Sequence, residues 1–192
     1  MTEFLRTTSF PLLNELSITC GEDWSGEEVT DLSNSIIALG PQLLSFSFTS
    51  IGSDFTTVLL PEVWPALTSV QHLTLHHNDN LPDILPLVRS SLVSFRLRAP
   101  VDEIEDMEFN FGALLEALAE PPAALNTLQH LTIPPIDPDY EREEEDDADD
   151  PLASSLQVVQ TICRHRGIKI SYAPDQRHAR FMEHIEDEVS LT

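Results

Sequence analysis

The sequence predicts an α/β protein in which short parallel strands alternate with helices. A six-residue frame with apolar residues at its first, fourth and sixth positions recurs along the chain. Between these frames the apolar residues follow helical spacing instead. The chain has 192 residues, which favours one domain with a sizeable core. We therefore expect residues 1–192 to form a single domain.

The repeated frame is most evident in the letters QHLT, which occur at Gln71–Thr74 and again at Gln129–Thr132. In a strand, the fourth and sixth positions point to one face and the residues between them point to the other. Each frame therefore predicts a short strand with one buried side. The apolar residues of the frames, the last one looser, are Leu13, Leu16 and Ile18; Leu43, Phe46 and Phe48; Val70, Leu73 and Leu75; Leu92, Phe95 and Leu97; Leu128, Leu131 and Ile133; Ile168, Ile170 and Tyr172.

The first interval between frames carries the signals of an amphipathic helix. Ser25 with Glu28 three residues later fits a capping box at its start. Gly40 followed by Pro41 predicts a left-handed cap and a stop at its end. Steps of three and four residues place four apolar side chains on one stripe. They are Val29, Leu32, Ile36 and Leu39.

Two further helices are predicted from their end signals. One begins at Asp150 and Pro151, because Asp is a good N-cap and Pro fits the first helical position, and it ends at Gly167. The other covers Phe111–Ala119 and stops before the pair Pro121–Pro122. The proline-containing strings at 59–67 and 81–88 predict short segments on the helical side.

The alternation of strand and helix around one apolar frame resembles a leucine-rich-repeat solenoid of the ribonuclease-inhibitor type. The resemblance covers roughly residues 12–174 and includes Asn78, which stands where that family has its turn asparagine. It implies about six irregular repeats, with parallel strands on the concave side and helices on the convex side. The spacings between fourth positions, 30, 27, 22 and 36 residues, are uneven. An ordinary α/β sandwich with parallel strands is the alternative.

In this fold, the strand residues that flank the buried positions form the concave surface, the usual binding face of solenoids. By position they are Glu15, Ser17 and Thr19; Ser45, Ser47 and Thr49; His72, Thr74 and His76; Ser94, Arg96 and Arg98; His130, Thr132 and Pro134. We expect a partner-binding site at His72, Thr74, His76, Arg96, Arg98 and His130. The alternative is a solvated strand face. A basic patch in a chain with only 10 Lys and Arg predicts a protein partner with an acidic segment.

Two segments outside the repeats have their own patterns. Residues 137–150 hold ten carboxylates and one Arg, with no apolar periodicity, which predicts a disordered acidic insertion. It is either a solvated insertion or an internal competitor for the basic patch. Residues 175–189 place Phe181, Met182, Ile185 and Val189 on one helical side, which predicts a C-terminal capping helix or a partner-binding one.

The sequence predicts a non-enzymatic protein. It has no glycine-rich phosphate loop, paired-cysteine metal motif or nucleophile elbow, so we assign no catalytic, cofactor or metal residue. Cys163 falls on an apolar stripe and is expected to be a buried core thiol. His72 and His76 lie about 13 Å apart along a strand, too far for one metal ion. A pH-sensitive contact is the more plausible role for these histidines.

The net charge and the absence of targeting signals limit which partners and which cellular location we expect. The formal net charge of −23 repels phosphate, which disfavours nucleic acid and anionic membranes as partners. The two cysteines are too few for a disulfide framework, and no apolar run reaches about 18 residues. We expect a monomer in the cytoplasm or nucleus.

A finer resemblance concerns the repeat regions of fungal F-box and leucine-rich-repeat proteins. It implies a substrate-recruiting adaptor of the ubiquitin-ligase type, although residues 1–12 are too short for an F-box. The rival hypothesis is an acidic chaperone that binds histones or other basic proteins, similar to the acidic leucine-rich nuclear phosphoproteins. It rests on the same repeats together with the acidic run. The charge sign of the partner separates the two hypotheses.

Overall fold

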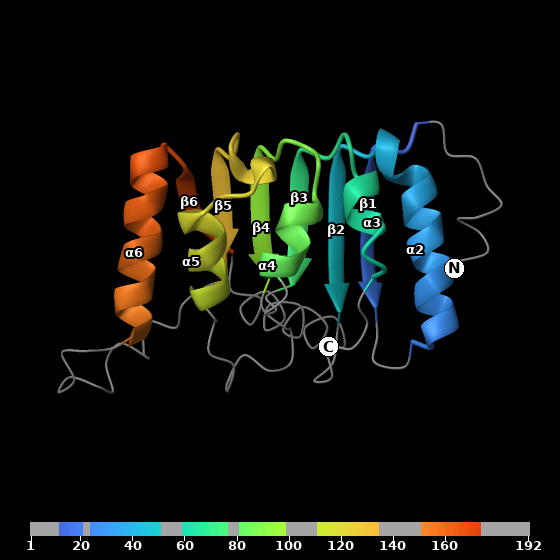
Figure 1. The fold of residues 1–192 in the computed structure, drawn as a ribbon, viewed down its shortest axis with the longest axis horizontal. Coiled ribbons are helices and arrows are strands. Elements are labelled where there is room, and N and C mark those ends of the chain that lie inside the picture. The colour runs from blue at the N-terminus through green and yellow to red at the C-terminus, as the bar shows by residue number, and fades with distance from the viewer. Residues whose placement is uncertain are drawn as a thin grey trace, which may run out of the picture.

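The protein is built on one sheet of six parallel strands. The computed structural model describes residues 12–20, 24–50, 59–76, 81–98, 111–134 and 151–173. The six strands lie side by side in chain order, as the repeated frame predicts (Figure 1). They are β1 (Glu15–Cys20), β2 (Ser45–Ser50), β3 (His72–His76), β4 (Ser94–Arg98), β5 (His130–Ile133) and β6 (Lys169–Tyr172).

Helices and short turns connect the strands and lie on one side of the sheet (Figure 1). The α-helices are α2 (Gly26–Leu39), α3 (Val63–Ala66), α4 (Leu81–Ile84), α5 (Phe111–Ala119) and α6 (Pro151–Arg166). Three 3₁₀ turns, η1 (Gly40–Gln42), η2 (Leu85–Leu87) and η3 (Ala123–Leu125), complete the described elements. The α/β architecture with a parallel sheet is thus confirmed. None of the described helices is long and apolar enough to cross a membrane.

A repeated hydrogen-bond pattern fixes the register of the strands. The carbonyl of Asn14 accepts from the N–H groups of both Leu44 and Ser45, at 2.7 and 3.0 Å. The carbonyls of Leu44, Gln71 and Val93 each accept in the same way from the first residue of the next strand and from the residue before it. Equivalent positions of the frame therefore stand beside one another across the sheet.

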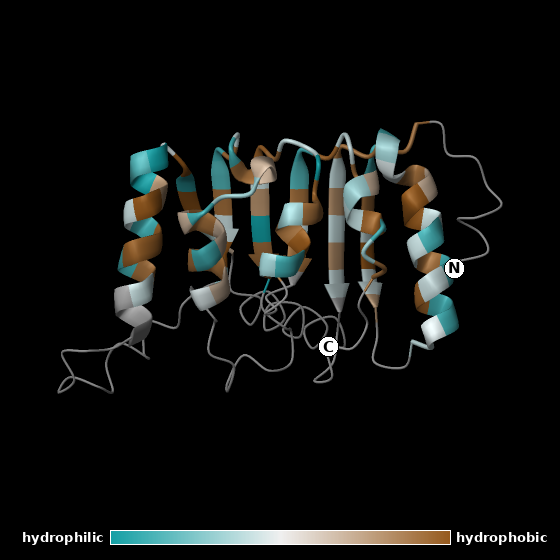
Figure 2. Cartoon of the chain, viewed as in Figure 1, coloured by the Kyte–Doolittle hydropathy of each residue, from teal (hydrophilic) through white to brown (hydrophobic). Residues whose placement is uncertain are grey.

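The apolar frame residues form the core between the sheet and the helices. Phe46, Phe95 and Leu131 are fully buried at the fourth position of their strands. The buried stripe of α2 and the short helix α3 cover this core, where the rings of Phe46 and Trp64 meet edge to face at 6.5 Å. Figure 2 shows hydrophobic bands crossing the strands and hydrophobic stretches along the helices.

Helix α2 begins as the sequence predicts and ends differently. The Ser25 hydroxyl accepts from the Glu28 N–H, and the Glu28 carboxylate accepts from the Ser25 N–H, which completes the capping box. The prediction of a left-handed cap at Gly40 is wrong, because its φ of −49° is right-handed and continues into η1. Gly40 is needed for space instead. A Cβ there would lie 2.7 Å from the carbonyl oxygen of Ala66.

The predicted bounds of the later helices are confirmed. Helix α5 covers Phe111–Ala119, and α6 covers Pro151–Arg166 and is followed by Gly167 at a φ of 70°. A left-handed residue at this place lets the chain turn from α6 into β6. The proline-containing strings form α3, α4 and the turn η2, as predicted.

The last strand departs from the frame. Tyr172, expected on the buried side, is 47% exposed, and its hydroxyl accepts from the Gln160 side chain of α6 at 3.2 Å. In the described chain β6 is the edge strand beside β5. The expected acidic insertion at 137–150 and the expected helix at 175–189 lie outside the described residues.

Candidate protein-interaction surface

Strand residues that alternate with the core residues form the opposite side of the sheet, which we call the outer strand face. Strand alternation places these positions on the side of the sheet away from the core. The outer strand face of the described strands contains Glu15, Ser17, Thr19, Ser45, Ser47, Thr49, His72, Thr74, His76, Ser94, Arg96, Arg98, His130, Thr132, Lys169 and Ser171. It contains every residue that the sequence predicts for a partner-binding site.

The first row across the outer strand face contains His72 and His130, two of the three histidines of the predicted site. His72 pairs in register with Ser94, Ser94 with His130, and His130 with Lys169. His72, His130 and Lys169 are exposed. Neighbouring strands are about 4.8 Å apart, so these side chains form one continuous line over four strands.

The second row places Arg96 between two threonines. Its partners in register are Thr74 on β3 and Thr132 on β5. Arg96 is exposed, Thr74 is half-buried, and Thr132 is buried with its hydroxyl 2.9 Å from that of Ser171. The guanidinium of Arg96 therefore has hydroxyl-bearing neighbours on both sides and no acidic residue beside it in this row.

The third row pairs His76 with Arg98 in register. Arg98 is half-buried, whereas the side chain of His76 lies outside the described part of the structure. Arg96 and Arg98 are two residues apart on one strand, a distance of about 6.6 Å along the chain. The predicted site residues thus share one surface over β3, β4 and β5.

We name the set His72, Arg96, Arg98, His130 and Lys169 the basic sector. It contains three of the chain's 10 Lys and Arg residues. Strands β3 to β6 contain no Asp or Glu. The basic sector is therefore a local reversal of sign in a chain with a net charge of −23.

Sequence reasoning missed Lys169 as a site residue, although it placed this residue in the last strand. Register shows that Ile170 stands beside Leu131 at the fourth position, so Lys169 occupies the third position beside His130. Ile168, the first apolar residue of this looser frame, is buried and lies beside Gln129. Aligning Ile170 with the fourth positions of the other frames would have found Lys169. Pro134, expected on this surface, is buried after the end of β5.

The other end of the outer strand face is rich in hydroxyl groups. Strands β1 and β2 carry only Ser and Thr there, apart from Glu15. The hydroxyls of Thr19 and Thr49 form a hydrogen bond of 3.0 Å, and the Ser47 hydroxyl is buried without a hydrogen-bond partner. The outer strand face therefore has a neutral polar sector next to the basic sector.

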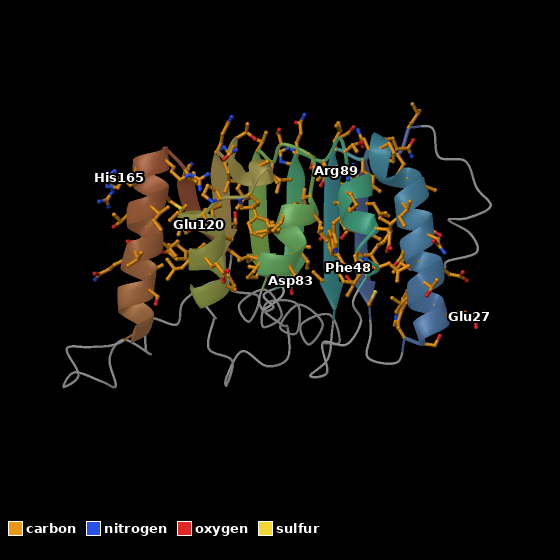
Figure 3. All side chains as sticks on the ribbon, in the orientation of Figure 1. Glu27, Phe48, Asp83, Arg89, Glu120 and His165 are labelled. Atoms are coloured by element: carbon orange, nitrogen blue, oxygen red, sulfur yellow. The ribbon has the colours of Figure 1, made fainter. Side chains whose placement is uncertain are left out.

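Acidic side chains of the described chain lie mainly on the helical side. Figure 3 labels Glu27 on α2, Asp83 on α4 and Glu120 after α5, and all three are exposed. Glu15 is the only acidic residue within the six described strands. The fold thus separates most of the described negative charge from the basic sector.

The two thiols are core groups. Burial raises the pKa of Cys20 to about 11 and also raises the pKa of Cys163, which the nearby Arg166 partly offsets. A raised pKa keeps a thiol protonated and weakly nucleophilic. The prediction of a buried core thiol at Cys163 is confirmed, because its side chain is 1% exposed.

Comparison of the chain with protein-family models, with curated proteins and with solved structures finds no match. The functional argument consequently rests on the geometry and the charge of the outer strand face.

Proposed function

We propose that this protein is a non-enzymatic interaction module that binds an acidic segment of a partner protein through its outer strand face. The observation that carries the proposal is the basic sector. Five basic or histidine side chains from four neighbouring strands share one surface. A concentrated patch of one sign selects a partner segment of the opposite sign.

The spacing within the basic sector fits an extended segment. Side chains two residues apart on an extended chain lie about 6.6 Å apart on one side, as Arg96 and Arg98 do. Two carboxylates of one acidic segment can therefore each meet a guanidinium, whether the segment runs along β4 or crosses the strands. Each guanidinium binds a carboxylate through two parallel hydrogen bonds, which adds directional preference to the charge attraction.

The overall negative charge does not remove this attraction. At physiological salt the Debye length is about 8 Å, so charges on the far side of the helices are largely screened at the sheet. The basic side chains act over shorter distances. Electrostatic recognition on this surface is thus local, and the net charge of the chain mainly affects the rate of approach.

The repeated frame and the one-sided helices support a finer proposal, in which the chain is a leucine-rich-repeat module with a concave binding face. In that proposal a substrate-recruiting role of the ubiquitin-ligase type follows from the resemblance of the repeats. The rival class, an acidic chaperone for histones or other basic proteins, is favoured by the 33 Asp and Glu residues and by the acidic helical side.

Charge-reversal variants test the proposal. The site variant combines His72→Glu, Arg96→Glu and Arg98→Glu. The matched control combines His165→Glu, Arg89→Glu and Arg164→Glu, which changes the same residue types at exposed positions outside the strands. We titrate each protein with a peptide that has glutamates at alternate positions and with its lysine counterpart, after circular dichroism has shown equal folding.

The proposal expects the native chain and the control to bind the glutamate peptide and the site variant to lose that binding. Exclusive binding of the lysine peptide by all three proteins would favour the chaperone class. Equal glutamate-peptide binding by the site variant and the control would remove the basic sector from the function.

A further inference from the structure

The outer strand face is electrically asymmetric from one end of the sheet to the other. Its first row runs Glu15, Ser45, His72, Ser94, His130 and Lys169, in register across all six strands. The row begins with an exposed carboxylate and ends with an exposed ammonium group. Two neutral serines separate the charged or titratable positions.

We propose that the bound segment crosses the strands with a defined polarity. Its acidic end lies over β4 to β6, and a basic residue at its other end lies over β1, where it meets Glu15. The inference rests on the proposed function, which supplies the acidic end, and adds the partner's second charged group and its orientation.

The direction of crossing follows from where the sign of charge changes. Within β4, both outer charges, Arg96 and Arg98, are positive. Glu15 stands alone as the acidic residue of the described strands, and it lies on the strand farthest from β6. The outer charge therefore changes sign from strand to strand across the sheet and not along a single strand.

The length of the row sets the length of the segment. Five strand spacings of about 4.8 Å separate Glu15 from Lys169, about 24 Å in all. An extended chain rises about 3.3 Å per residue, so roughly seven residues cover the row. The two ends are farther apart than the Debye length of about 8 Å at physiological salt, so each end contributes independently to binding.

The neutral polar sector over β1 and β2 suits the backbone of such a segment. Ser17, Ser45 and Ser47 occupy the outer positions of β1 and β2 without charge. A hydroxyl both donates and accepts, so it can pair with either peptide group. Ser17 is exposed on β1, and Ser45 lies between Glu15 and His72 in the first row.

Two designed peptides test the polarity. The bipolar peptide has two lysines, a spacer of four glycine and serine residues, and three glutamates; the unipolar peptide replaces both lysines with serines. Both have blocked ends, so that terminal charges do not contribute. Binding is measured by fluorescence polarisation at about 100 mM salt, where the Debye length is about 10 Å.

The native chain should bind the bipolar peptide about two- to fivefold more tightly, the effect of one exposed ion pair. Glu15→Gln should abolish that preference and leave the affinity for the unipolar peptide unchanged. The matched control is Glu27→Gln, which removes another exposed carboxylate, from α2, and should keep the preference. This control separates a contact at Glu15 from a general decrease in repulsion between the acidic protein and the glutamates of the peptide.

A spin label on the lysine end should broaden the amide signals of β1, and a label on the glutamate end those of β6. Equal affinities of the native chain for the two peptides, or an unchanged preference in Glu15→Gln, would overturn the polarity while leaving the acidic-segment proposal in place. Failure of both peptides to bind, or binding that survives Arg96→Glu with Lys169→Glu, would overturn the proposed function and the polarity together.

Discussion

Gly40 shows how one residue permits two parts of the helical layer to meet. A Cβ at this position would lie 2.7 Å from the carbonyl oxygen and 3.0 Å from the carbonyl carbon of Ala66. Because the neighbour is backbone, it can give way only if α3 moves. We expect Gly40→Ala to lower the free energy of unfolding by about 1–3 kcal/mol, the usual cost of overpacking.

Gly26 provides the matched control for this substitution. It is the first residue of α2, and a Cβ there would have nothing within 4 Å. Gly26→Ala should be neutral or stabilise the protein by up to about 1 kcal/mol, because alanine loses less backbone entropy. Urea unfolding midpoints of both variants test the difference. Equal midpoints would show that Ala66 moves without cost.

The capping box of α2 gives stability a defined dependence on pH. The Ser25 N–H, with a further contribution from the Ser25 hydroxyl, lowers the pKa of Glu28 below 4.5. The carboxylate of Glu28 therefore stabilises the fold above pH 4.5, and this contribution is lost as pH falls through its folded-state pKa. Glu28→Gln should be less stable than the native chain at pH 6, and the difference should shrink below pH 4.5.

Glu27→Gln is the control for this pH dependence, because it removes a carboxylate from the same first turn. Unlike Glu28, Glu27 has no role in the capping box. Thermal unfolding of the three proteins between pH 3 and pH 6 makes the comparison. A difference between the native chain and Glu28→Gln that stays constant with pH would show that the ionised carboxylate contributes nothing.

At the scale of elements, Arg166 joins the last helix to the preceding repeat. Its guanidinium donates to the carbonyl of Leu125 at 2.6 Å and to that of Leu118 at 3.4 Å. Leu125 ends η3, where its carbonyl also accepts from the Leu128 N–H at 3.3 Å, and Leu118 lies in the last turn of α5, where helical N–H partners run out. Arg166→Met should lower the free energy of unfolding by about 1–3 kcal/mol, as expected when a charged donor is lost from buried acceptors.

Arg164→Met is the corresponding control, because Arg164 is exposed on the same helix. Its replacement should change stability by less than about 0.5 kcal/mol, the usual range for surface substitutions. Chemical unfolding that is monitored by circular dichroism measures both variants. Similar losses in the two variants would indicate that the charge near the end of α6, and not the contact of Arg166, is what matters.

The sequence predicted strands and longer helices well because their signals are local. The spacing of Leu16 and Ile18 identifies a strand within six residues, and Ser25 with Glu28 identifies a helix start within four. The role of Gly40 was not predictable in this way, since its contact, Ala66, is 26 residues away. Local patterns predict conformation, whereas close approach depends on the packed structure.

The candidate site was predictable for a related reason. Once each frame is aligned, parallel pairing in chain order brings equal positions together, so Arg96 falls beside Thr74 without further information. The alignment failed at β6, where the frame is looser, and Lys169 was missed as a result. The burial of Thr132 on the outer strand face was not predictable. Strand alternation predicts which face of the sheet a side chain lies on, but not whether neighbouring side chains cover it.

At the scale of the whole molecule, the net charge of −23 opposes the compact state through self-repulsion. Binding at the basic sector instead depends on attraction between its positive charges and an acidic partner. Added salt should therefore act in opposite directions on folding and on binding. Raising sodium chloride from about 20 to 500 mM screens self-repulsion, so the unfolding midpoint should rise. We expect a rise of at least about 2–4 °C, which corresponds to about 1 kcal/mol in a domain of this size.

The same salt increase should weaken binding of the alternating glutamate peptide, because its attraction to Arg96 and Arg98 is screened as well. Near pH 4, where many carboxylates become protonated, the salt effect on the midpoint should become smaller, which provides the control. Thermal melts and peptide titrations over one salt series measure both responses. An unchanged unfolding midpoint would mean that the negative charges are balanced locally in the fold. Peptide binding that strengthens with added salt would mean that apolar contact, not charge, holds the partner.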